Sequence, residues 1–534
     1  MKLIVNRDLF LYDIKALIRT FCLGEKIDLL ISEDVFLDRD SYSFGQWNVW
    51  SEMISGGTAE HGAVDQKVCL FLEMEELSSK ADGQILACLF NAKGELLGKR
   101  ESPGTPDDRR AYKNQIKRVL FLLFEDVYCK GDKIDEEYRI SKVPAWGILT
   151  GVRPTKLPME YLNMGWKDEE IFSFLKKEYL CSDEKLSLAV SIAKTEKKLL
   201  EPVDLKDGYS LYIGIPFCPT TCHYCSFASF SMERFSAMVP DYLEALHKEI
   251  ESTAGLMKGR KLTCVYFGGG TPTTLSAGQL KELILHVKKA FPMEDVLEFT
   301  VEAGRPDTIT EEKLRVLLEC GVTRISINPQ TMQQKTLDLV GRNHSVEQIR
   351  RSMEMARTLG FDNINMDLIV GLPQEGVEDV RDTLEQIKQM KPDSLTVHSM
   401  VLKRAARLNL MMTVRETTDA DIMENMVELG MQYAKEMGLL PYYMYRQKNA
   451  QGSRNQSRDN IGYAAPGKEG IYNIIIMEEL QSILALGAGA TTKFTDAATG
   501  RIERADNVKS IKDYIERIDE MIERKKLVLK AMGQ

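Results

Sequence analysis

Three cysteines stand close together in the segment GIPFCPTTCHYCSF, where Cys218, Cys222 and Cys225 follow the spacing C-x3-C-x2-C. Three thiolates can hold three irons of a 4Fe–4S cluster and leave the fourth iron open to an added ligand. Zinc is the alternative, but a structural zinc site needs four ligands. His223 is available as the fourth, although its place inside the two-residue spacer makes chelation of the same ion awkward. The spacing therefore favours a cluster over zinc.

A second candidate is the glycine-rich segment YFGGGTPTTL, which covers residues 266–275. Glycines allow a ligand to approach the backbone closely and to meet its N–H and C=O groups. The segment lacks the Lys-Ser/Thr pair of a P-loop and the G-x-G-x-x-G spacing of a dinucleotide-binding fold. A simple glycine-rich turn is the alternative interpretation.

Both segments belong to a run of alternating strands and helices that begins near residue 209. We expect strands at 211–217, 262–270, 297–304, 323–330, 363–371 and 394–401, with amphipathic helices between them. This alternation predicts parallel βαβ units, in a barrel or an open sheet. In both architectures the active site lies at the C-terminal ends of the strands. Those ends carry the cysteine segment, Gly268–Thr271, Glu302, Gln330 and Asp367, so we expect a site there.

The rest of the chain divides around this run. Residues 1–145 alternate short apolar runs with turns and one helix, which predicts an N-terminal α+β domain. Residues 146–208 are typical of a helical connector, and residues 209–440 form the core. Residues 441–534 are a C-terminal α/β extension, which we expect to contact the substrate or to form a lid. Within it we expect an apolar strand at 472–477, a glycine-rich turn and a final helix.

Composition excludes several classes of protein. The 534 residues carry a net charge of −9 and the pI is about 5.5, which argues against a dedicated nucleic-acid binder. The N-terminus lacks the pattern of a signal peptide, and no apolar run is long enough to span a bilayer. We therefore expect a cytoplasmic protein. Seven scattered cysteines are predicted to be buried, reduced thiols, namely Cys22, Cys69, Cys88, Cys129, Cys181, Cys264 and Cys320.

The order of the motifs resembles a known family. C-x3-C-x2-C followed by GGGTPT resembles the radical S-adenosylmethionine (SAM) superfamily, and in particular its oxygen-independent coproporphyrinogen III oxidase (dehydrogenase) branch. Four further matches follow in order: Glu302 in TVEAGRPD, Gln330 in RISINPQT, Arg342 in LVGRNH and Asp367 in NMDLIVGLPQE. The likeness is strong over residues 209–440 and weaker over 441–495. The segments GVRPTKL, EAGRPDT and KRAARL are most similar to the HemZ-type branch.

This resemblance implies a fold and a set of site residues. The fold would be a partial (β/α)6-type radical SAM barrel, with the N-terminal α+β domain and the C-terminal α/β extension added. The three cysteines would hold a 4Fe–4S cluster. The residues that would line the SAM site are Tyr212, Tyr224, Gly269, Gly270, Thr271, Glu302, Gln330, Arg342 and Asp367. Val401 and Thr491 occupy weaker matches, and the catalytic residues stay unassigned.

The resemblance also implies an activity, the conversion of coproporphyrinogen III or a related tetrapyrrole without oxygen. Reductive cleavage of SAM would give methionine and a 5′-deoxyadenosyl radical, which takes a β-hydrogen from a propionate. Loss of CO2 and one electron would then leave a vinyl group. These steps would take place on two propionates of each substrate molecule to give protoporphyrinogen IX. An electron donor such as flavodoxin or ferredoxin is required. The cations Lys403, Arg404 and Arg407 are candidates to bind the propionates, with a solvated helix start as the alternative.

Two departures from the family pattern bear on the substrate. Phe227 stands where the best-known oxidases have a further cysteine. Haem-chaperone relatives carry a His-Asn-x-x-Tyr-Trp motif, whereas this chain has DNIGYA, with Asp459 in place of the histidine and Ala464 in place of the tryptophan. A carboxylate is not a usual haem ligand. A haem chaperone and a radical SAM enzyme with another substrate, such as a methyltransferase, remain the alternatives.

Overall fold

The computed structural model describes residues 1–21, 27–31, 37–38, 43–44, 68–74, 83–91, 93–134, 139–140, 142–400, 420–447, 459–496 and 499–532. These residues divide into two compact units. Unit 1 comprises Met1–Gly151 and Tyr161–Val190, and unit 2 comprises Val152–Glu160, Ser191–Ala450 and the remainder of the C-terminal part. The four-part division predicted from the sequence stays a prediction.

Unit 1 is built on a five-stranded sheet in the order β2-β1-β5-β6-β7. Its strands are β1 (Lys2–Val5), β2 (Asp28–Ile31), β5 (Cys69–Glu73), β6 (Gly83–Phe90) and β7 (Leu96–Gly104). The helix α3 (Arg109–Phe124) begins at Asp108, whose carboxylate accepts from the backbone N–H groups of Arg110 and Ala111. Its apolar side packs on β6 and β7, so this unit has the predicted α+β character.

Smaller elements complete unit 1. They are α1 (Leu11–Phe21), the short antiparallel pair β3 (Leu37–Asp38) and β4 (Ser43–Phe44), the π-helix Glu125–Cys129, and α5 (Asp168–Tyr179). Residues 146–208, predicted to be a helical connector, contain the three helices α4 (Lys156–Asn163), α5 and α6 (Asp183–Leu199).

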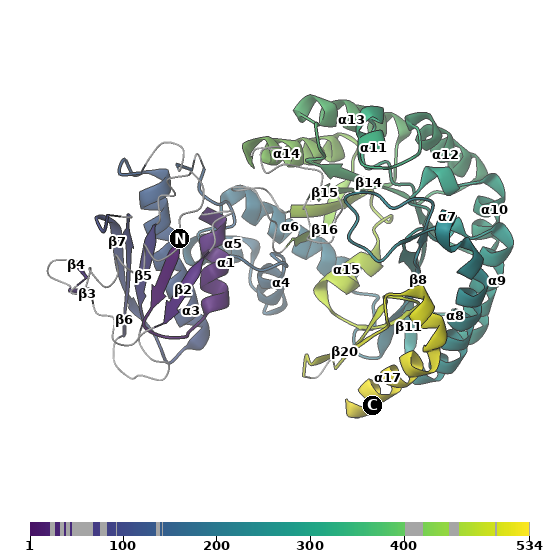
Figure 1. Ribbon diagram of the computed structural model, residues 1–534, viewed down its shortest axis with the longest axis horizontal. Helices are drawn as coiled ribbons and strands as arrows, with labels where there is room; N and C mark the ends of the chain where they lie inside the picture. The colour runs from purple at the N-terminus through teal and green to yellow at the C-terminus, as the bar shows by residue number, and fades with distance from the viewer. Residues whose placement is uncertain are drawn as a thin grey trace. The chain divides into compact units, whose positions relative to one another are not determined.

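Unit 2 contains the predicted run of parallel strands. They are β8 (Gly208–Ile215), β11 (Lys261–Gly269), β12 (Glu298–Glu302), β13 (Arg324–Ser326), β14 (Ile364–Val370) and β15 (Ser394–Ser399). Each pairs in parallel with the next. The helices that follow them are α8 (Val239–Ala254), α9 (Ala277–Ala290), α10 (Glu311–Glu319), α12 (Val346–Leu359), α13 (Val377–Met390) and α14 (Ala420–Glu436). Figure 1 shows α8, α9, α10 and α12 following one another along the outer side of this sheet.

The six parallel strands form an arc that other strands continue at both ends. On one side β15 pairs with antiparallel β17 (Asp459–Ala464), which pairs with β16 (Leu440–Arg446). On the other side β8 pairs in parallel with β18 (Ser482–Leu486), and β19 (Thr491–Thr495) and β20 (Ile502–Asp506) follow. The predicted fold class, a partial (β/α)6-type barrel, is confirmed.

The inner face of the arc is polar. Arg324 of β13 donates to the Ser394 hydroxyl of β15 at 3.0 Å, and that hydroxyl donates to Asn365 of β14 at 3.1 Å. Asn365 also donates to Asp367 at 2.7 Å. Alternate residues of each strand therefore face inward, while the intervening apolar residues face the helices. This alternation places Glu302 of β12 and Asp367 of β14 on the inner face.

The prediction of a strand at 472–477 was wrong, because these residues lie in the helix α15 (Ile471–Glu478). Tyr472 and Ile475, three residues apart, both pack into one core cluster with Cys264 and Ile483. The three consecutive isoleucines favour a strand locally, but a helix is what places both of these side chains in this cluster. The predicted final helix is present as α17 (Ile518–Ala531), preceded by α16 (Ile511–Glu516).

None of the helices in the described residues is long and apolar enough to cross a membrane.

Candidate cofactor site at the strand ends

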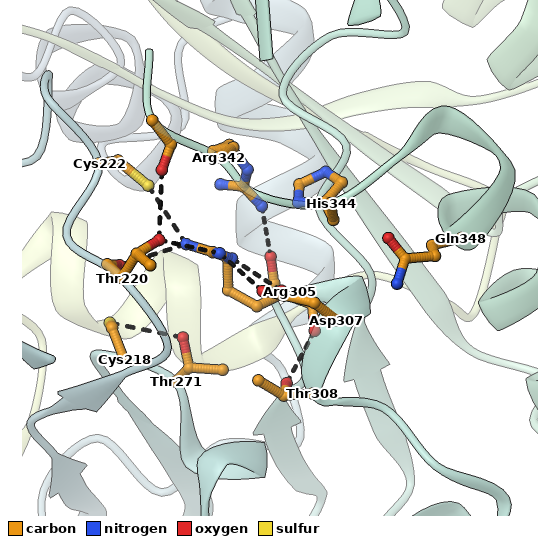
Figure 2. A network of polar contacts seen from close by, with 12 residues as sticks. Cys218, Thr220, Cys222, Thr271, Arg305, Asp307, Thr308, Arg342, His344 and Gln348 are labelled. Carbon is orange, nitrogen blue, oxygen red and sulfur yellow. Dashed lines mark hydrogen bonds and ion pairs between the residues drawn. The ribbon is translucent and has the colours of Figure 1, made fainter. Parts of the chain in front are cut away.

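The three cysteines lie on the loop that follows β8. Cys218 ends the two-residue strand β9 (Phe217–Cys218), and its thiol lies 3.5 Å from the hydroxyl of Thr271. The Cys222 sulfur accepts an N–H from Arg305 at 3.6 Å, and the Cys225 N–H donates to the Cys222 carbonyl at 3.1 Å. The thiols of Cys218 and Cys222 are thus placed by different neighbours (Figure 2).

The geometry of this loop suits a cluster better than a single ion. Among the described residues, no three side chains of His, Cys, Asp or Glu converge to hold one metal ion. The His223 ring turns away to Leu339, with Nδ1 3.1 Å from its carbonyl oxygen. A zinc site requires four ligands around one point, whereas each cysteine of a 4Fe–4S cluster binds a separate iron. The donor set therefore fits the cluster.

The glycine-rich segment at the end of β11 lies directly against the cysteine loop. Gly269 has φ +109°, which a residue with a Cβ rarely adopts. A Cβ on Gly270 would lie 2.6 Å from the Phe217 carbonyl oxygen and 3.0 Å from the Cys218 sulfur. The Gly270 N–H donates to Ile215 and the Thr271 N–H to Phe217. This close approach explains the glycines and fixes the loop on the strand end.

We therefore expect Gly270→Ala to displace the cysteine loop, at a cost of about 1–3 kcal/mol for overpacking. Thermal unfolding of the metal-free protein measures the loss of stability, and iron content after reconstitution measures the displaced thiols. Gly278→Ala is the matched control, because a Cβ there meets only the Ser276 hydroxyl, at 4.0 Å. Equal stability and iron content in the two variants would contradict the argument.

A stacked pair of tyrosines leads from the glycine segment to the end of β12. Tyr212 stacks on Tyr266 with ring centroids 6.2 Å apart, and the Tyr266 hydroxyl donates to Glu302 at 2.6 Å. Burial raises the pKa of Glu302 to about 7, opposed by the Tyr266 hydrogen bond and reinforced by the charge of Asp367. Glu302 is therefore a carboxyl group that changes its charge near neutral pH.

Asp367 lies on β14, two strands along from β12, and its pKa is shifted in the opposite direction to that of Glu302. Burial acts to raise its pKa, but the nearby His398 and the amide of Asn365 more than offset it, so the pKa of Asp367 lies below its usual value. His398 Nε2 lies 3.9 Å from the Asp367 carboxylate. Gln330, whose φ is +65°, donates its N–H to the Asp367 carbonyl at 2.9 Å. A left-handed backbone at a glutamine is uncommon and is often found at functional sites.

Arg342 links the remaining predicted residues. Its guanidinium donates to the Tyr224 hydroxyl at 3.0 Å and to the carbonyls of Gly304 and Asn328 at 2.7 Å each. Within the described residues, three buried polar atoms here have no hydrogen-bond partner: Gln330 Oε1, Asn328 Oδ1 and Arg342 Nε. Buried polar atoms of this kind are normally satisfied, so their grouping fits a polar ligand such as SAM.

The other sequence-predicted residues have different surroundings. The Thr491 hydroxyl donates to Asp506 on the β19–β20 hairpin at 2.6 Å. The Phe227 side chain is 72% exposed. Five sequence-predicted residues lie outside the described part of the chain: Cys22, Val401, Lys403, Arg404 and Arg407. Of the other six cysteines predicted to be buried, Cys129 is only half-buried.

Comparison with known proteins identifies the family. Residues 212–387 match the sequence profile of the radical SAM superfamily. The oxygen-independent coproporphyrinogen-III oxidase-like protein HemZ of Bacillus subtilis is 43% identical over 386 residues, which cover 71% of this chain and 76% of that protein. This chain is a HemZ-type radical SAM protein.

Two further relatives carry different names. The heme chaperone HemW of Bacillus subtilis is 34% identical over 257 residues, covering 48% of this chain and 66% of that protein. The oxygen-independent coproporphyrinogen III oxidase of Escherichia coli is 28% identical over 315 residues, which cover 58% of this chain and 65% of that protein. The HemZ-type chain therefore belongs among radical SAM oxidoreductases whose cofactors are a 4Fe–4S cluster and SAM.

Sequence reasoning missed three residues that the structure places within this HemZ-type site. Tyr266 supports Glu302, Asn328 presents an unpaired amide oxygen, and Arg305 contacts Cys222. Tyr266 had a usable signal, because it stands two residues before Gly268 and so faces the same side of β11. The assignment of Cys218, Cys222 and Cys225 to the cluster, and of the strand-end residues to SAM, stays a prediction.

Proposed function

We propose that this chain catalyses the oxygen-independent oxidative decarboxylation of coproporphyrinogen III to protoporphyrinogen IX, a step of haem biosynthesis. The observation that carries the proposal is the convergence of the cysteine loop, the glycine segment and the carboxylates Glu302 and Asp367 at one edge of the sheet in a HemZ-type chain. The relatives named as oxidases support the reaction.

In this proposal the chain's own residues hold and orient both cofactors. Cys218, Cys222 and Cys225 bind the cluster, and the carboxylates of Glu302 and Asp367 attract the positive charges of SAM. The Arg342 guanidinium holds Tyr224 against the strand ends. When bound, the cofactors supply a carbon-centred radical that abstracts hydrogen from the substrate.

The substrate and partners are inferred from chemistry. A tetrapyrrole with four carboxylates requires cations, and we propose Lys403, Arg404 and Arg407 for this role. The electron comes from a low-potential protein such as a flavodoxin or ferredoxin. We assign the chain to the cytoplasm, where thiols stay reduced; none of the described cysteines forms a disulfide.

The structure bears on the chaperone alternative through Asp459. This residue takes the position of the chaperone's histidine in DNIGYA, and its carboxylate lies 3.5 Å from Arg446 Nε. The Asp459 side chain is 2% exposed. A buried carboxylate paired with a guanidinium is not available to bind haem iron. This ion pair favours the enzyme over the chaperone.

The test compares the two functions on one preparation. With reconstituted cluster, dithionite and SAM under anaerobic conditions, we expect SAM-dependent loss of CO2 from coproporphyrinogen III. Chromatography of the porphyrins after oxidation measures this loss. A parallel haem titration should give no stoichiometric Soret-absorbing complex. Tight haem binding without decarboxylation would reject the proposal in favour of a chaperone. SAM cleavage without decarboxylation would reject it in favour of another substrate.

A further inference from the structure

Arg305 lies in the loop after β12, and all of its N–H donors are used. Arginine carries five such donors. The Nε–H and one N–H of Nη2 donate to the Asp307 carboxylate at 3.0 and 2.8 Å. The second N–H of Nη2 donates to the Thr220 hydroxyl at 3.2 Å. The two donors of Nη1 bond the Thr220 carbonyl at 3.3 Å and the Cys222 sulfur at 3.6 Å. Figure 2 shows the guanidinium between the cysteine loop and Asp307.

Arg305 is 3% exposed, so these bonds are formed away from water. Thr220 lies between Cys218 and Cys222 in the chain, and its hydroxyl donates onward to the Gly341 carbonyl at 3.2 Å. The guanidinium thus connects the middle of the cysteine loop to two other strand-end loops. Its charge is balanced by Asp307, so the pair as a whole is neutral.

We propose that Arg305 is a positioning residue that fixes the cysteine loop and, through its N–H bond to the Cys222 sulfur, raises the reduction potential of the cluster. The inference rests on the proposed assignment of Cys222 as a cluster ligand. It goes beyond that assignment by giving Arg305 a role in controlling electron entry.

The physical reason lies in where the electron's charge goes. One electron from an external low-potential reductant adds negative charge at the site, and this charge is shared with the cysteine sulfurs. A donor aimed at such a sulfur stabilises the reduced state more than the oxidised state, which raises the potential. Lysine is a poor substitute, because an ammonium group lacks the planar fork that bonds Asp307, Thr220 and Cys222 together.

The experiment uses Arg305→Gln, Arg305→Lys and Asp307→Asn in the reconstituted full-length protein. Iron per chain and circular dichroism report assembly and folding, and an electron paramagnetic resonance redox titration reports the midpoint potential. We expect both Arg305 variants to shift the potential to more negative values. Asp307→Asn should shift it the opposite way, because the guanidinium keeps its donors but loses its counter-charge.

A purely structural clamp would lower iron content in these variants and leave the potential of the assembled cluster unchanged, which would overturn the inference. If the Arg305 variants fail to assemble a cluster, Asp307→Asn decides alone, and an unchanged or more negative potential rejects the proposal. Failure of the underlying assignment looks different. In that case Cys222→Ser itself would retain its iron.

Discussion

Replacing Cys218, Cys222 or Cys225 by serine is expected to reduce the iron content of the reconstituted protein from about four per chain to near zero. The brown charge-transfer absorption and the SAM-dependent release of 5′-deoxyadenosine should disappear with the iron. The Cys218 thiol contacts Thr271 and the Cys222 thiol contacts Arg305, while the Cys225 backbone N–H donates to the Cys222 carbonyl, so the three cysteines have different surroundings. A two-thiolate site would therefore not retain the cluster.

Cys264 and Cys320 provide matched controls for this result. Both are buried thiols in the same unit, 0% and 2% exposed. Cys264 packs in the core beside Tyr472, outside the cysteine loop. Alanine at either position should cost some stability through the cavity that it leaves but should keep the full iron content. Stoichiometric zinc in the wild-type protein, or iron retained in all three serine variants, would reject the cluster assignment.

Much of unit 2 was predictable because parallel strands impose a simple geometry. Each strand has a local apolar pattern, and the C-terminal ends of parallel strands meet at one edge. The residues Glu302, Gln330 and Asp367 are distant in sequence but lie on or just after three neighbouring strands: Glu302 ends β12, Gln330 follows β13 and Asp367 lies within β14. Knowing the strands was therefore enough to predict that these side chains gather.

Other features depended on information that local pattern does not contain. The helix α15 is a case where burial on several sides outweighs the strand preference of consecutive isoleucines. The contact of Arg305 with Cys222 spans 83 residues and depends on how two loops meet. Loops carry no periodic signal, so the sequence alone could not place this guanidinium on the cysteine loop.

Glu302→Gln is expected to weaken SAM binding roughly tenfold at about pH 8, because a charge-assisted contact is worth more than a neutral one. The same change should stabilise the ligand-free protein. Burial raises the pKa of Glu302 from 4.5 to about 7, so its ionisation in the folded state opposes folding. This cost to folding is absent at pH values below 4.5 and grows between pH 4.5 and about pH 7. Above that pH it is complete, at about 3 kcal/mol.

The pH profile separates this interpretation from a general loss of structure. In the wild type, SAM affinity should rise from about pH 6 to pH 8 as Glu302 ionises, whereas the glutamine variant should lack that component. Ionisation of SAM itself is common to both proteins and cancels in the comparison. Calorimetric titration measures the affinity, and thermal unfolding of the ligand-free protein at several pH values measures the stability. Equal pH profiles for wild type and variant would contradict the assignment of Glu302 to SAM.

Glu298→Gln is the control, because Glu298 lies on the same face of β12 at its opposite end. Its carboxylate accepts from the Thr300 hydroxyl at 2.6 Å and from the Tyr472 N–H at 3.1 Å, so its partners belong to the interior packing. The control should leave the pH dependence of SAM affinity unchanged. We expect Glu302→Gln alone to raise the stability of the ligand-free protein and to give a weaker SAM affinity that lacks the pH-dependent component. This result would mean that the Glu302 carboxylate costs folding free energy and is kept because it binds a cation. If Glu298→Gln removes the pH dependence equally, the titrating group is not Glu302.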